Sequence, residues 1–387
     1  MITTIRVTNR RRIRECQELL LFHGPGSADG IPEGTPSSAA GLWGGSGTGK
    51  SSLVDQIAWI ADGIRDTGEA WRPMVPIENN RGWAGETPGE TTCMIGGLDA
   101  EGRYEYTLSA TTETITDEEL WYQPHERSGE ADAEHRASGI ILARTKHAVT
   151  TSSGVCEDGT QIRSFERRTP VLAHAAADQT PAMRAVRREI LGIRIVRPDG
   201  DIRDDLALTA RTAESDGPTR SLAGIRRQLV HGLLENIGLH LGALDEQTSR
   251  ISREVREAIA SAGRGAQGAA AIAGHAAHVL IHGGLLVVDP IDSGIHSIWS
   301  RQLVETFMQQ PHAGRRRGQL LFTTGSSDLL TALPRDQVWL ADAVGERNPA
   351  TIDSLASFKN VDAARLRQDY ELGRYGGVPG DNPVTLQ

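Results

Sequence analysis

Residues 44–51 read Gly44-Gly45-Ser46-Gly47-Thr48-Gly49-Lys50-Ser51, which matches the pattern GxxxxGK[ST] at every fixed position. The stretch follows a short apolar segment, 39–43, that we expect to be a β-strand. It precedes a segment with apolar residues at helical spacing: Leu53, Ile57, Ile60 and Ile64. Glycines let such a loop turn its backbone N–H groups toward phosphate oxygens, and the helix start adds its positive end. The stretch therefore predicts a phosphate-binding loop in an α/β fold.

Each residue type in this loop has a predicted role toward a bound nucleoside triphosphate and its metal ion. Lys50 would reach the β- and γ-phosphates of ATP, and the Ser51 hydroxyl would ligate Mg²⁺. The loop backbone and the first helical residues would enclose the phosphates. The predicted nucleotide-binding residues are Gly44, Gly45, Ser46, Gly47, Thr48, Gly49, Lys50, Ser51 and Ser52.

A second motif lies far along the chain, where four apolar residues, 285–288, end at Asp289. A continuous apolar run of this kind is typical of a strand that is covered on both faces. An acidic residue at the end of such a strand holds the Mg²⁺ of phosphate-loop proteins, so Ser51 and Asp289 are the predicted metal-site residues. We expect the two motifs to meet at adjacent strand ends.

Further elements are expected around these motifs. Apolar runs predict buried strands at 319–324 and 337–341, with a helix at about 297–309 between the second motif and the first of them. Segments 91–98 and 103–110 read as a hairpin. A second hairpin is expected around residues 198–200, and the stretch from about 217 to 282 reads as helical.

The residues from 287 onward, VVDPIDSGIHS, resemble the VDEID-x-x-[LI]-H stretch of bacterial AAA family ATPases with an ABC-like head. These are relatives of the structural-maintenance-of-chromosomes, RecF and overcoming-lysogenization-defect proteins. Other stretches agree with the same group, among them ITTIRVTNRRRIRE near the start, DAEGRYEYTLSA, LLFTTGSSDLL and GRYGGVP. The resemblance covers nearly the whole chain, and members of the group are often encoded in anti-phage defence operons.

The resemblance implies a P-loop NTPase with an ABC-type head, in which a mainly helical insertion separates two lobes. The expected segments are an N-terminal lobe at 1–165, the insertion at 166–275 and a C-terminal lobe at 276–387. Such heads bind the nucleotide between two copies, so a homodimer is expected. The predicted contacts to the opposing copy are Ser261 and Gly263, in a possible signature region, and His296 after the second motif.

Two departures from the family pattern affect hydrolysis. The family has a Glu after the Asp of the second motif and a His after the TT of the following strand, whereas this chain has Pro290 and Gly325. Neither can serve as a general base, and losing one typically costs 10²–10⁴ in rate. Asp292 is the one carboxylate that could substitute as a weak catalytic candidate.

Three functions therefore stay open from the sequence. The chain is an ATPase that acts as a nucleotide-driven switch in phage defence, or a pseudo-ATPase that binds ATP without efficient hydrolysis and gates an effector protein from a neighbouring gene. The third reading is a decayed gene product. Binding of labelled ATP separates the third reading from the others, and turnover per site separates the first two.

Composition limits the partners and the compartment. The chain has 387 residues and a net charge of −9, so the total charge does not support DNA binding, although the run 315–317 is basic. No apolar run is long enough to cross a membrane, and the charged start is unlike a signal peptide. The 3 Cys are widely spaced, which suits a reducing compartment. We therefore expect a cytoplasmic protein without a membrane partner.

Overall fold

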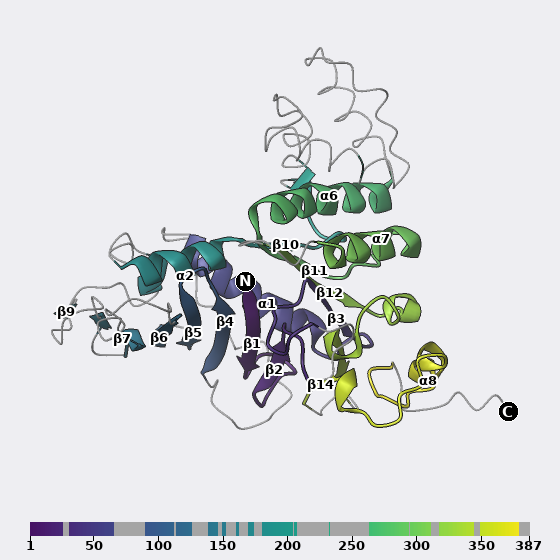
Figure 1. The fold of residues 1–387 in the computed structure, drawn as a ribbon, viewed down its shortest axis with the longest axis horizontal. Helices are drawn as coiled ribbons and strands as arrows, with labels where there is room; N and C mark the ends of the chain where they lie inside the picture. The colour runs from purple at the N-terminus through teal and green to yellow at the C-terminus, as the bar shows by residue number, and fades with distance from the viewer. Residues whose placement is uncertain are drawn as a thin grey trace, which may run out of the picture.

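The computed structural model describes residues 1–25, 31–65, 90–111, 114–125, 138–145, 149–151, 160–161, 169–173, 180–203, 205–206, 232, 263–293, 295–310, 317–343 and 349–378. These residues form two β-sheets with helices between and outside them, which is the α/β class that the sequence predicts (Figure 1). None of the described helices is both long enough and apolar enough to pass through a bilayer.

The sheet that carries both motifs has six strands in the order β10-β11-β12-β3-β13-β14. The first five run parallel, and β14 pairs antiparallel with β13. The strands predicted at 39–43, 285–288, 319–324 and 337–341 are confirmed as β3, β11, β12 and β13. The bounds are β3 Ala39–Trp43, β10 Ile193–Val196, β11 Gly284–Val288, β12 Gly318–Thr324, β13 Val338–Asp342 and β14 Thr351–Ser354.

The second sheet has eight strands, all paired antiparallel, in the order β2-β1-β4-β5-β6-β7-β8-β9. The hairpin predicted over 91–98 and 103–110 is confirmed as β4 and β5. The bounds are β1 Ile2–Thr8, β2 Gln17–Leu20, β4 Thr91–Leu98, β5 Gly102–Ala110, β6 Ile115–Pro124, β7 Gly139–Arg144, β8 Val149–Thr151 and β9 Thr160–Gln161.

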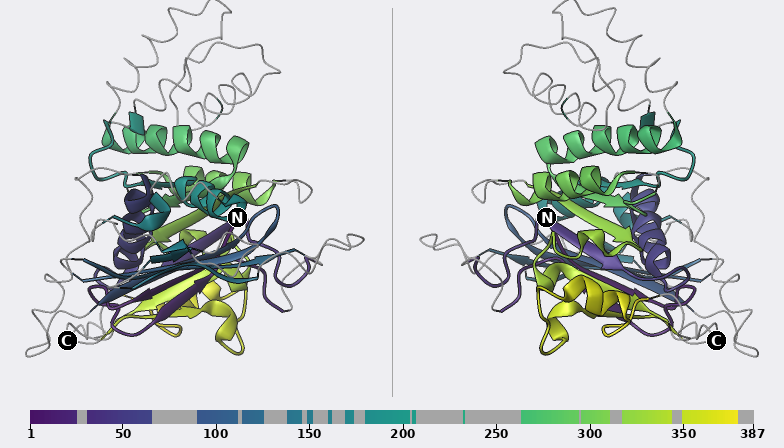
Figure 2. Two further views of the ribbon diagram at one scale, coloured as in Figure 1. Left: turned by 90° about the vertical axis from the view of Figure 1, so that its left-hand side faces the viewer. Right: turned by 90° about the vertical axis from the view of Figure 1, so that its right-hand side faces the viewer.

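The helices divide between the two faces of the six-stranded sheet. Along β11, Leu285 and Val287 pack with α1, α2 and the eight-stranded sheet, whereas Leu286 and Val288 pack with α6 and α7. Figure 2 shows α6 and α7 on the side of the molecule away from the eight-stranded sheet. The bounds are α1 Lys50–Arg65, α2 Pro181–Leu191, α6 Arg264–His282, α7 Ser297–Met308 and α8 Leu366–Glu371, with 3₁₀ turns η4 Val171–Ala173, η6 Ser327–Leu329, η7 Arg335–Gln337 and η8 Leu355–Ser357.

The hairpin expected around residues 198–200 is wrong. The strand before it, β10, pairs in parallel with β11, and the described residues after the turn form no strand with it. The buried parallel strand β11 is a better pairing partner for the backbone of β10 than a short polar return strand would be. Of the stretch expected to be helical, 264–282 is helix α6, whereas 217–262 lies outside the described residues except for Gly232. The division into two lobes and an insertion stays a prediction, although β10 falls within the range 166–275.

Candidate functional site

The glycine-rich loop joins the end of β3 to the first residue of α1, as predicted. Gly47 and Gly49 have φ values of +79° and +99°, which side chains rarely adopt. At Gly49 a Cβ would also lie 2.9 Å from the Ala350 side chain. The Gly44 N–H donates to Thr324 O at 3.2 Å, which ties the loop to the end of β12. The glycines are therefore required by backbone geometry and by close approach.

Lys50 lies folded over its own loop. Its ammonium donates to Gly44 O at 2.5 Å and to Gly45 O at 2.6 Å. Burial lowers the pKa of Lys50, and the nearby charges of Asp289 and Asp292 oppose that shift. A half-buried ammonium whose contacts within the described part of the chain are carbonyl oxygens can exchange them for the oxygens of an anion.

Asp289 meets the loop helix. Ser51 Oγ donates to Asp289 Oδ1 at 3.3 Å although the two residues are 238 positions apart, and Thr323 Oγ1 donates to the same oxygen at 2.5 Å. The carboxylate is 5% exposed. The two motifs therefore come together, but not at adjacent strand ends, because β12 lies between β3 and β11. Thr323 on that intervening strand completes the contact, and the sequence analysis missed it.

Asp292 lies at the same edge of the sheet, in the turn after β11. Thr324 Oγ1 donates to its Oδ2 at 2.7 Å, and the Gly325 N–H donates to that oxygen at 3.3 Å. Pro290 is between the two acids in this turn. Asp292 and Gly325 therefore meet at the end of β12, beside the turn that carries Pro290.

The remaining residues of the predicted nucleotide site differ in exposure. Ser46 is exposed, whereas Thr48 is buried and donates from Oγ1 to Gly45 O at 2.9 Å. Ser51 is exposed, and Ser52 is buried at 5% exposure. Thr48 therefore helps to close the loop, and Ser51 is the hydroxyl that faces Asp289.

The residues predicted to contact an opposing copy are placed in part. Ser261 lies outside the described residues. Gly263 caps α6 without a side-chain hydrogen bond, and His296 is an exposed N-cap of α7 whose Nδ1 accepts from Ile298 N at 3.2 Å. Within the described part of the chain, no hydrogen bond or ion pair joins Gly263 or His296 to the glycine-rich loop.

A group of charged residues beside the loop helix was not found from the sequence. Asp55, on α1, contacts Arg11 Nη1 at 2.8 Å and Arg197 Nη2 at 2.6 Å, and Arg10 Nη2 lies 3.7 Å from the same carboxylate. The Arg197 Nε atom lies 3.9 Å from Asp289 Oδ2. The run of arginines near the start of the chain was visible, but only the fold brings it to α1.

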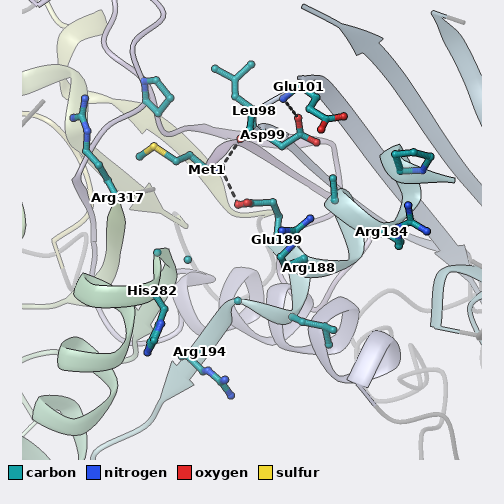
Figure 3. Close-up of a pocket in the computed structure, with 18 of the residues that line it drawn as sticks. Met1, Leu98, Asp99, Glu101, Arg184, Arg188, Glu189, Arg194, His282 and Arg317 are labelled. Atoms are coloured by element: carbon teal, nitrogen blue, oxygen red, sulfur yellow. Dashed lines mark hydrogen bonds and ion pairs between the residues drawn. The ribbon is translucent and has the colours of Figure 1, made fainter. Parts of the chain in front are cut away.

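A separate cavity of about 770 Å³ lies at the opposite ends of β10, β11 and β12 (Figure 3). Two of its acidic groups are already engaged, since Asp99 accepts from Glu101 N and Gly102 N, and Glu189 pairs with the Met1 ammonium at 2.8 Å. Figure 3 shows the Arg317 and Arg194 side chains on different sides of the cavity and directed apart. Its charged groups do not converge on one ligand position, so the chemistry of the chain is centred on the loop.

No family model matches the chain, and no curated protein does. Among solved structures the chain is similar to cbiO1 from Clostridium perfringens, described as part of the ABC transporter complex cbiONQ. The identity is 13%, the match covers 57% of this chain and 77% of that chain, and the TM-score is 0.27. At that TM-score the similarity carries no argument about this chain. The strand order and loop contacts above define an α/β chain in which a glycine-rich loop joins a strand to a helix.

Proposed function

We propose that this chain binds ATP together with Mg²⁺ at the loop 44–51 and acts as a nucleotide-dependent switch with an ABC-like head. The observation that supports it is the convergence of Lys50, Ser51 and Asp289 at one edge of the sheet. Ser51 Oγ and Asp289 Oδ1 are 3.3 Å apart, and the Lys50 ammonium donates to the loop carbonyls Gly44 O and Gly45 O. This is the donor and acceptor set that a metal-bound triphosphate requires.

The residues present fit a magnesium ion. Mg²⁺ prefers oxygen ligands and usually binds through one or two protein oxygens plus phosphates, and here Ser51 and Asp289 offer such oxygens. When bound, the ion would neutralise charge on the β- and γ-phosphates. Thr323 orients the Asp289 carboxylate by donating to it. Lys50 would exchange Gly44 O and Gly45 O for phosphate oxygens.

We propose further that hydrolysis is slow. Pro290 and Gly325 stand where the resemblance expects a general base and a histidine, and neither has a group that can take a proton from water. The alternative is an active ATPase with Asp292 as the base. Asp292 Oδ2 already accepts from Thr324 and Gly325, so one oxygen of this carboxylate is held by the end of β12. The lack of a proton-accepting group at positions 290 and 325 favours the pseudo-ATPase.

The substitution Lys50→Ala tests the site. It removes the ammonium at Gly44 and Gly45, so binding of Mg²⁺ and fluorescent ATP, followed by anisotropy, should fall below detection. Lys359→Ala is the matched control, because it removes the same charge at an exposed position. Equal affinity of the Lys50→Ala variant and the unmodified protein for ATP would contradict a nucleotide site at the loop 44–51.

The other parts of the reading stay predictions that rest on the resemblance. They are the role in anti-phage defence, the effector protein from a neighbouring gene, the cytoplasmic location and the homodimer that encloses the nucleotide.

A further inference from the structure

Three guanidinium groups share a single carboxylate beside the loop helix. Arg11 and Arg197 contact Asp55 at 2.8 Å and 2.6 Å, and Arg10 lies 3.7 Å from it. The Asp55 side chain is 12% exposed, so solvent screens this cluster only in part. Asp55 lies four residues along α1 from Ser51. On a helix, residues four apart share one face.

Arg197 is the member of the cluster that also reaches the metal-site acid. It follows β10, whose last residue accepts the Asp289 N–H at 3.0 Å, so the two strand ends lie side by side. The Arg197 Nε atom is 3.9 Å from Asp289 Oδ2, whereas Oδ1 of the same carboxylate takes the Ser51 and Thr323 hydroxyls. Arg197 therefore faces the oxygen of Asp289 that no hydroxyl uses in the described contacts.

The Arg197 side chain can change partner at modest cost. It is 41% exposed, and ion pairs at such exposure contribute little to stability. Its contact with Asp289 is long, whereas its contact with Asp55 is short. A guanidinium with a planar fork of donors suits phosphate oxygens better than an ammonium does. Asp55 can hold one side of the fork while the other side turns toward an anion.

We propose that Arg197 is a phosphate-binding residue that contacts the γ-phosphate of a bound nucleoside triphosphate and so distinguishes ATP from ADP. The inference rests on the proposed function, because it assumes that the nucleotide lies at Lys50 and Ser51. Arg197 exchanges Asp289 for γ-phosphate oxygens and keeps Asp55 as its anchor. ADP lacks that phosphate, so the guanidinium stays on Asp289.

The test compares fluorescent ATP with fluorescent ADP, both with Mg²⁺, on Arg197→Ala, Arg197→Lys and the unmodified protein. In Arg197→Ala the dissociation constant for ATP should rise about tenfold or more, on the usual worth of a hydrogen bond to a charged group. The constant for ADP should stay within about twofold. Arg197→Lys keeps the charge without the fork and should lie between the two. Arg203→Ala removes an exposed arginine that pairs with Asp201 and is the matched control.

The outcomes separate this inference from the proposed function. Equal weakening of ATP and ADP in Arg197→Ala overturns the inference, because it indicates a purely structural partner of Asp55. Unchanged binding of both nucleotides overturns it as well. If Lys50→Ala loses both nucleotides in the same assay, the proposed site holds in either case. Failure of the unmodified protein to bind either nucleotide overturns the proposed function and this inference together. Thermal unfolding of each variant identifies a loss of folding.

Discussion

Gly325 follows the last residue of β12 and leaves a space beside the glycine-rich loop. A Cβ at Gly325 would have Gly44 O at 3.7 Å, which is ordinary van der Waals contact, so a side chain fits there. Gly44 O is also one of the two oxygens that hold Lys50. A side chain at position 325 would therefore lie beside the loop that is proposed to hold the phosphates. Glycine leaves that place without a polar group that could orient water.

Restoring both missing groups should restore turnover. In the double variant Pro290→Glu with Gly325→His, a carboxylate stands in the turn after β11 and an imidazole after β12, and phosphate release should rise by about 10²-fold or more. Thermal unfolding of the double variant shows whether it keeps the fold. The measurement is steady-state phosphate release per site.

Adding Lys50→Ala to the double variant is the control, and it should return the rate to background. Brisk turnover by the unmodified protein would contradict the prediction and would indicate that Asp292 acts as the base. No gain in the double variant would indicate that further hydrolytic groups are missing.

At the scale of elements, a buried carboxylate joins the eight-stranded sheet to the segment that precedes α2. Glu118 on β6 is fully buried, and it accepts from Val171 N at 2.7 Å, Leu172 N at 3.0 Å and Tyr106 Oη at 2.9 Å. Burial raises the pKa of Glu118, and these donors oppose that shift, as does the charge of Arg144. The carboxylate thus holds the 3₁₀ turn η4 against the sheet.

The substitution Glu118→Gln keeps the shape of this side chain but turns an amide group toward backbone donors. Leaving one buried N–H without an acceptor should lower the free energy of unfolding by about 1–3 kcal/mol. Urea unfolding followed by circular dichroism measures it. Glu119→Gln is the matched control, because Glu119 is the next residue of β6 and is only half-buried. A loss of the same size in both variants would count against the role of Glu118.

The strands of the six-stranded sheet could be predicted where the sequence is locally decisive. The runs at β3, β11, β12 and β13 are apolar on both faces because helices or the second sheet cover both faces, and that pattern is visible in the sequence. The periodicity of α1 was visible in the same way. These elements also carry the loop and Asp289, so most of the candidate site could be predicted with them.

Pairing partners that are far apart in the chain could not be predicted, because periodicity describes an element and not its distant neighbour. The four residues of β10 are compatible with a hairpin, yet their partner is β11, from much later in the chain. The same limit applies to Thr323, whose strand lies between the two motifs. Arg10, Arg11 and Arg197 look like ordinary polar turn residues in the sequence. Only the assembled fold brings them to Asp55.

At the scale of the whole molecule, the end of the six-stranded sheet that carries the glycine-rich loop is connected to α6 and α7. Arg197 is followed by Pro198, and a Cβ at Gly268 of α6 would lie 2.9 Å from the Pro198 Cβ atom, so that turn packs tightly on α6. Asp292 precedes α7 by a short turn, and the His296 cap begins that helix. A change of contacts at this end of the sheet can therefore reach α6 and α7, the two helices that cover this face.

Exposed groups at the start of α7 offer a surface for a second copy of the chain. Ile298 is 62% exposed, and the neighbouring His296 is also exposed. The turn that leads to them carries Asp292, whose carboxylate is bonded to the end of β12. A copy that pressed on this surface would therefore be sensitive to what the loop holds.

If the nucleotide is enclosed between two copies and is hydrolysed slowly, ATP with Mg²⁺ should convert the monomer to a long-lived dimer. Light scattering after size-exclusion chromatography should then report a doubled mass with ATP and a monomer without nucleotide. Ile298→Asp introduces a charge that the interface would have to desolvate, so this variant should stay monomeric while it still binds ATP. Ile140→Asp is the matched control, because Ile140 is 53% exposed on β7 in the other sheet, and this variant should dimerise normally. A dimer that forms without nucleotide would contradict enclosure of the nucleotide between the two copies, and a dimer that persists in Ile298→Asp would contradict an interface at the start of α7.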